Sequence, residues 1–259
     1  LCALAVLALA GCKKNEQTGT KTFKATISQL NSDAKTEIGT GNWLVWSDND
    51  QIKVYNADKT ETATFNIETG VGTKEATFSG TLPESNTYYA FYPTTGVELT
   101  PEYVTEFTLS GTQTFVEGNF ASNLYPMYAI STDGNFSFYS PCGVLGIAMK
   151  GTATIGSILL TDSLGMDLAG TFEMAGADVN FQDTHSGVGI TLSFGEGLTL
   201  NETTATLVYF VVPAGALSNG FKADVKGTDG NRIVLLETST PNPVTAETIH
   251  LMPEVTGDL

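Results

Sequence analysis

Residues 144–149 read VLGIAM and residues 207–212 read LVYFVV. Both runs are apolar at nearly every position, so neither side of the chain is suited to water. Such short runs are typical of central strands that are covered on both faces of a sheet. Residues 88–92, 158–160 and 233–236 have the same character. We therefore expect several strands that lie between other layers.

Elsewhere, apolar and polar residues alternate, which indicates strands with one buried face and one wet face. The alternation is clear at Phe136 and Phe138, at Ile190, Leu192 and Phe194, and at Phe221, Ala223 and Val225. Turn signals such as Asp133-Gly134-Asn135 and Asp229-Gly230-Asn231 separate the runs. No long stretch has the 3.6-residue period of a helix. The sequence predicts an all-β fold of sandwiches or barrels.

The chain carries 28 acidic and 12 basic residues, a net charge of −16. Such a surface repels phosphate backbones, so we expect no nucleic-acid partner. There are only two histidines: His185 in a polar loop, and His250, which alternates with Ile249 and Leu251 and should face solvent. Asp48-Asn49-Asp50 resembles part of a calcium loop but lacks the closing Glu, so it is interpreted as a turn before a strand at 51–55. The sequence predicts no catalytic site, no cofactor and no metal.

The chain begins LCALAVLALAG (1–11), which is too short to cross a bilayer that needs roughly 20 residues. It suits the apolar core of a signal peptide, whose basic start we expect before residue 1. Leu9-Ala10-Gly11-Cys12 resembles the lipobox of bacterial lipoproteins. This resemblance implies cleavage before Cys12, a diacylglycerol on its thiol, and a membrane anchor followed by a polar tether. Cys142 then remains as a buried core thiol, and no intrachain disulfide is expected.

Several further segments occur in order along the chain. They are Lys35-Thr36, Trp46, Asp50-x-Ile52-x-Val54, ATFSG (76–80), YYAFYP (88–93), Gln113, PMYA (126–129), FSF (136–138) before GVL (143–145), and TIHLMP (248–253). With the lipobox, this order resembles the fimbrillin-like lipoproteins of Bacteroidales, which include major and accessory pilus subunits. The resemblance covers nearly the whole chain after Cys12.

The resemblance implies two transthyretin-like (Greek-key) β-sandwich domains in tandem, on an outer-membrane lipoprotein at the cell surface. We divide the chain into a signal peptide (1–11), a tether with an N-terminal strand (12–34), and sandwiches at 35–133 and 134–259. The boundary near residues 130–140 rests mainly on the usual size of a domain.

In pilus-building members of this family, a protease removes the first strand, and a strand from a neighbouring subunit takes its groove. Here residues 22–28 (TFKATIS) form the expected strand, with Phe23, Ala25 and Ile27 on one face. Residues 31–35 form a polar link that offers Lys35-Thr36 as the cut site.

The donor would be the C-terminal strand with Ile249 and Leu251 as anchors, unless that strand completes its own C-terminal sandwich. The expected partners are other fimbrial subunits and a host or bacterial surface ligand.

The cut site departs from the family pattern, because the best-known members are cut after Arg. The matching residue here is Lys35, and the single arginine of the chain is Arg232. Either a Lys-tolerant protease acts, or the protein stays lipidated as an anchor or a non-polymerising relative. Lys35 is otherwise a solvated loop lysine.

The leading hypothesis is a non-enzymatic subunit of a fimbria that serves adhesion. The alternative is a surface glycan-binding lipoprotein, which an exposed cluster of aromatic side chains would favour. Asp162-Ser163-Leu164 also resembles the sites that Bacteroidales O-glycosylate, with Ser163 as the acceptor. The simpler interpretation of this tripeptide is a boundary between a strand and a turn.

The lipobox generates a direct prediction. Labelled palmitate should enter the wild-type protein in cells, and Cys12→Ser should abolish the label, because the thiol is the attachment point. Gel fluorography of the two proteins checks this. Equal labelling of both would show that Cys12 is not lipidated.

Overall fold

The computed structural model describes residues 19–28, 30–32, 44–99, 105–121, 123–175, 178–180, 188–255 and 259. In these ranges every regular element is a β-strand, so the all-β prediction is confirmed. No helix in the described part has the length and apolar character of a membrane span. The signal peptide, Cys12, Lys35, Thr36 and His185 lie outside the described residues.

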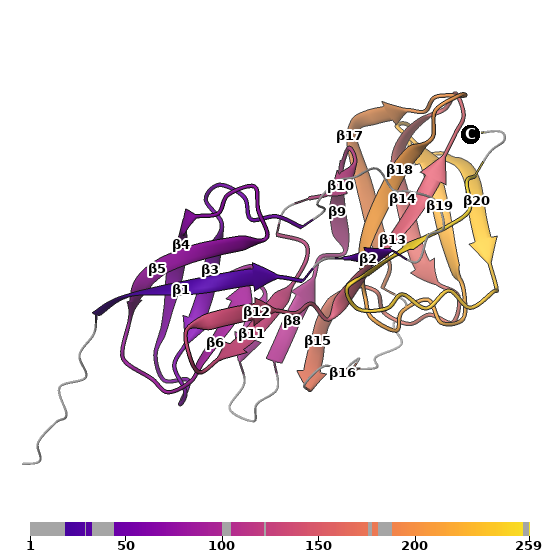
Figure 1. The fold of residues 1–259 in the computed structure, drawn as a ribbon. Helices are drawn as coiled ribbons and strands as arrows, with labels where there is room; N and C mark the ends of the chain where they lie inside the picture. The colour runs from indigo at the N-terminus through magenta and orange to yellow at the C-terminus, as the bar shows by residue number, and fades with distance from the viewer. Residues whose placement is uncertain are drawn as a thin grey trace, which may run out of the picture.

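A seven-stranded sheet occupies one end of the molecule (Figure 1) and has the order β11-β6-β3-β4-β5-β1-β12. Its strands are β1 (Gly19–Ile27), β3 (Gln51–Tyr55), β4 (Thr62–Thr69), β5 (Glu75–Leu82), β6 (Tyr88–Tyr92), β11 (Met127–Ser131) and β12 (Asn135–Phe138). The two outermost strands meet at Tyr128 and Tyr139, which exchange backbone hydrogen bonds of 2.8 and 2.9 Å. The sheet therefore closes on itself.

A six-stranded sheet with the order β10-β9-β17-β14-β19-β20 lies at the other end. Its strands are β9 (Thr112–Val116), β10 (Asn119–Phe120), β14 (Thr154–Asp162), β17 (Ile190–Thr199), β19 (Phe221–Gly227) and β20 (Arg232–Thr238). It shares a core with the sheet β18-β13-β21-β2, which is made of β2 (Asn31–Ser32), β13 (Cys142–Met149), β18 (Thr206–Pro213) and β21 (Thr248–Leu251). The fourth sheet, β16-β15-β8-β7, contains β7 (Val97–Leu99), β8 (Thr105–Leu109), β15 (Gly170–Ala175) and β16 (Asp178–Asn180).

The pair β13 and β18 is buried on both faces. Val144 and Val211 belong to the same hydrophobic core as the seven-stranded sheet. Their neighbours Leu145 and Phe210 belong to the core shared with the six-stranded sheet. This explains why the two runs are apolar throughout, and it confirms the prediction made from them.

The same prediction was wrong for residues 233–236. They lie in β20, the last strand of its sheet, and Leu235 is 37% exposed. A strand at the edge of a sheet can be apolar throughout even when only some of its side chains are covered. The apolar run at 233–236 therefore did not show where this strand lies in the sheet.

The turn between β19 and β20 is Asp229-Gly230-Asn231, as the sequence indicated. The Asp229 carboxylate accepts hydrogen bonds from the backbone and side-chain nitrogens of Asn231, at 3.0 and 2.8 Å. Gly230 has a φ of 79°, which favours glycine. The turn Asp133-Gly134-Asn135 repeats this pattern, with both bonds at 2.9 Å.

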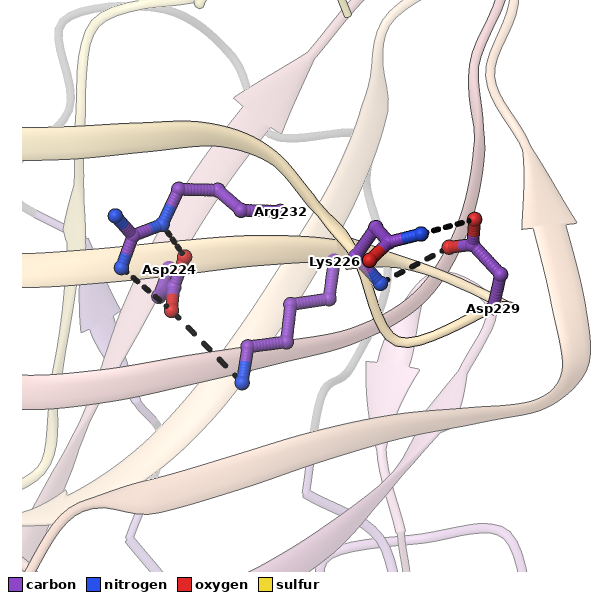
Figure 2. Close-up of polar contacts among 5 residues, drawn as sticks. Asp224, Lys226, Asp229 and Arg232 are labelled. Carbon is purple, nitrogen blue, oxygen red and sulfur yellow. Dashed lines mark hydrogen bonds and ion pairs between the residues drawn. The ribbon is translucent and has the colours of Figure 1, made fainter.

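Charged side chains lie on β20, the last strand of its sheet, and on its neighbour β19. The Arg232 guanidinium of β20 donates two hydrogen bonds to the Asp224 carboxylate of β19, at 2.5 and 3.0 Å (Figure 2). The Lys226 ammonium lies 3.9 Å from the same carboxylate. These hydrogen bonds hold the pKa of Asp224 below its usual value. Charges on an edge strand discourage pairing with another sheet.

Strands pair across the boundary that the sequence predicted between two sandwich domains, at residues 133 and 134. β12 lies after that boundary yet pairs with β1, and β9 lies before it yet pairs with β17. The two-domain count therefore stays a prediction.

The free edge of β18 is covered by a side chain. Gln113 of β9 is only 1% exposed. Its Nε2 donates to the Val211 carbonyl at 2.8 Å, and its Oε1 accepts from the Val211 N–H at 3.0 Å. The amide thus takes the place that a neighbouring strand would otherwise occupy.

We expect Gln113→Leu to destabilise the protein, because it leaves the buried N–H and C=O of Val211 unpaired, at about 1–3 kcal/mol for each group. Urea unfolding measures the loss. The control is Gln51→Leu, at an exposed position where the side-chain amide donates to Asn66. Equal losses in the two variants would contradict the role given to Gln113.

Candidate functional site

β1 is seated between two strands that are distant from it in sequence. It pairs antiparallel with β5, for example Phe23 opposite Phe78, and parallel with β12, for example Ala25 opposite Phe136. The strand begins at Gly19 rather than at residue 22, since its polar start still pairs with the end of β5. Both edges of its backbone are therefore engaged.

The inner face of β1 fills the core. Phe23, Ala25 and Ile27 are 4%, 1% and 4% exposed, whereas Lys24 and Thr26 face outward. The Phe23 ring packs against the rings of three other strands, with centroids 4.9 Å from Phe65, 4.9 Å from Tyr88 and 5.1 Å from Phe136. Burying a Phe or Ile side chain is worth about 1.5–3 kcal/mol, so these residues hold β1 in place.

The chain continues from β1 into a second sheet. Leu30 is buried in the core of the seven-stranded sheet, and Asn31–Ser32 forms β2, which pairs in parallel with β21. The prediction of a polar link was therefore wrong for residues 31 and 32, because backbone pairing does not need an apolar side-chain pattern.

The C-terminal strand β21 lies between β13 and β2. Ile249 is 1% exposed, and Leu251 is half-buried. The sequence left open whether this strand is a donor for another subunit or completes a sheet of its own subunit. In this structure β21 pairs within its own chain, in the sheet that contains β13 and β18. His250 is half-buried rather than fully turned to solvent.

Two glycines of β13 allow the C-terminal segment to approach closely. A Cβ at Gly143 would lie 2.2 Å from the Thr245 carbonyl oxygen, and one at Gly146 would lie 2.4 Å from Cδ2 of Leu251. No larger residue fits at Gly143 unless the backbone moves. The close packing of the β21 segment against β13 therefore requires glycine at these positions.

A half-buried carboxylate lies between the residue that follows β1 and the start of β21. Glu247, just before β21, accepts a hydrogen bond from the Ser140 N–H at 3.2 Å, and its own N–H donates to the Cys142 carbonyl at 2.8 Å. Burial raises the pKa of Glu247, and its hydrogen bonds with Ser140 and with Ser28, the residue after β1, only partly oppose this.

The remaining predicted residues are placed as follows. Cys142 is fully buried, and burial raises the pKa of its thiol, so the core thiol is confirmed. Asp50 closes the expected turn by accepting a hydrogen bond from the Ser47 N–H at 2.7 Å. Ser163 directly follows β14, as expected of a strand–turn boundary, and its glycosylation stays a prediction. In the described ranges, no cluster of three or more His, Cys, Asp or Glu side chains is suited to a metal.

Sequence reasoning assigned no role to Glu247, named Gln113 only as part of the family resemblance, and treated Asn31 and Ser32 as part of a polar link. Each acts through contacts with residues about a hundred or more positions away, such as the 98-residue separation between Gln113 and Val211. A polar residue within an apolar alternation was the only signal that could have singled out Gln113.

No family model and no curated protein matches the sequence. Solved structures do match. A candidate cell adhesion protein from Bacteroides ovatus has a TM-score of 0.51 at 12% identity, over 88% of this chain and 89% of that chain. A fimbrial protein from the same species has a TM-score of 0.42 at 13% identity, over 90% and 49% of the two chains. At such low identity, the first similarity shows that the folds are alike.

The half-buried carboxylate of Glu247 leads to a pH prediction. A raised pKa in the folded state means that stability falls as the pH rises from the ordinary glutamate pKa through the raised one. Glu247→Gln keeps an oxygen for the Ser140 N–H and removes the charge, so it should raise the melting temperature at pH 7 and have little effect in acid, where the carboxyl is protonated. Calorimetry at both pH values checks this, with the exposed Glu202→Gln as the control. A lower melting temperature for Glu247→Gln at pH 7 would contradict the prediction.

Proposed function

We propose that this protein is a structural subunit of a cell-surface fimbria, without enzymatic activity, that serves adhesion and assembles by strand exchange. The observation that best supports the proposal is that β1 is paired between β5 and β12. A strand held by backbone pairing and by a few apolar side chains can be replaced by another strand that offers the same pattern.

The pattern required of a replacement is simple. Phe23, Ala25 and Ile27 occupy alternate positions, and their side chains point into one core. In β21, Ile249 and Leu251 have the same spacing. A copy of the C-terminal strand is therefore the simplest donor, and its backbone would satisfy the freed edges of β5 and β12.

Further support comes from the shared fold with a candidate adhesion protein, whose description we extend to this chain as a proposal. The alternative of glycan binding receives less support. In the described part, the large apolar side chains that are exposed are aliphatic: Val71, Val116, Ile130, Leu164, Val188 and Leu235. An aromatic platform for sugars would require exposed rings.

Within this proposal, Cys12 anchors the protein in the outer membrane, and a cut at Lys35-Thr36 releases the segment that contains β1. Uncut protein is held as a closed monomer, because about 1 kcal/mol of net stabilisation for each backbone hydrogen bond adds to the buried Phe and Ile. Removal of the segment leaves two unpaired edges and an open core, which a second subunit then fills.

Limited trypsin digestion of the Cys12→Ser protein tests this proposal. After a cut at Lys35 and loss of the N-terminal segment, the trimmed core should form ladders on a native gel. Ile249→Asp should abolish the ladders, because a charge cannot enter the core of a neighbour. The control is Leu235→Asp, a similar change at a more exposed position on β20, which should leave the ladders intact.

Protein with Lys35→Gln should resist the cut and remain monomeric. A trimmed core that stays monomeric at high concentration would reject strand exchange as the mode of assembly.

A further inference from the structure

The segment that contains β1 contributes to two sheets. β1 ends at Ile27 and β2 begins at Asn31, which pairs with Thr248, while Ser32 pairs with Ile249 of β21. Figure 1 shows β2, in the dark colour of the N-terminus, among the strands at the other end of the molecule from β1. The same stretch therefore lies against the gap that accepts a strand and against the strand suited to be the donor.

The inner edge of the C-terminal segment is firmly paired. Backbone N–H groups of Glu247, Met252 and Val255 donate to carbonyl oxygens along β13, at 2.8, 2.9 and 2.8 Å. The outer edge is covered by β2, which is the last strand of its sheet in the described part of the chain. Without β2, β21 would be an edge strand with unpaired backbone groups.

The two contacts differ greatly in extent. β1 pairs with β5 through eight residues, from Gly19 to Thr26, and with β12 through four. β2 pairs with β21 through two. So short a pairing is weak alone, but the three-residue connection to β1 keeps β2 at a high effective concentration beside β21. β2 should therefore leave whenever β1 leaves.

We propose that residues 19–32 cover two strand-docking edges at once: β1 fills the gap between β5 and β12, and β2 covers the outer edge of β21. A single cut would then open the acceptor gap and, at the same time, remove one of the two strands that hold the donor β21 in its own subunit. This inference rests on the proposed function. Its consequence is that no subunit loosens its donor strand while its acceptor gap is still filled.

Hydrogen–deuterium exchange of the Cys12→Ser protein tests the double cover. One variant, Asn31→Pro with Ser32→Pro, removes both amide donors of β2 and leaves β1 intact. Amides of residues 248–251 should then exchange about tenfold faster, while those of residues 75–82 in β5 stay protected. The other variant, Ala25→Asp, places a charge in the core beneath β1 and should speed exchange in both regions. Unchanged protection of residues 154–162 in β14 shows that each variant is folded.

The outcomes separate the two proposals. If Ala25→Asp opens β5 while residues 248–251 remain protected, the double cover is wrong and strand exchange is unaffected. If the proline variant changes neither region, the double cover is also wrong. If both regions open as expected but neither trimmed protein nor Ala25→Asp associates in sedimentation experiments, the double cover stands and the fimbrial proposal fails.

Discussion

The structure depends on burying both faces of the strand pair β13 and β18. Val144 and Leu145 are adjacent in sequence and lie in two different hydrophobic cores. A sheet without a wet face must have a layer on each side, so this pair joins the seven-stranded sheet to the six-stranded one. Because the two cores share these strands, a substitution at Cys142 or Gly143 should also disturb the packing of β1 and β21, the strands of the proposed exchange.

A sheet edge is a template for further pairing, and each edge considered above is handled in a different way. The seven-stranded sheet closes through Tyr128 and Tyr139, β18 is covered by the Gln113 amide, and β20 carries Arg232, which pairs with Asp224 of β19. The outer edge of β21 is covered by β2 instead. In the proposed function these covers differ in permanence, because those made by side chains stay with the fold, whereas β2 belongs to the segment that the proposed cut at Lys35 would remove.

The position of β1 also bears on the order of folding. Ser28, directly after β1, donates a hydrogen bond to Phe138, 110 residues later in the chain. Contacts of such long range close large loops and tend to form late. The pairing of β1 with β12 is therefore expected to form later than the pairing of strands that are close in sequence.

The amino-acid sequence by itself determined that the chain is all-β, where several central strands lie, that Cys142 is buried, and that Asp-Gly-Asn forms tight turns. These properties follow from local chemistry: side-chain alternation, apolar runs and the conformational freedom of glycine. Only the tertiary structure decided which strands are neighbours, that residues 31 and 32 pair with β21, that the run at 233–236 lies on an edge, and that Gln113 covers Val211. Strand pairing is made by backbone groups that every residue carries, so a sequence pattern can mark a strand without identifying its partner.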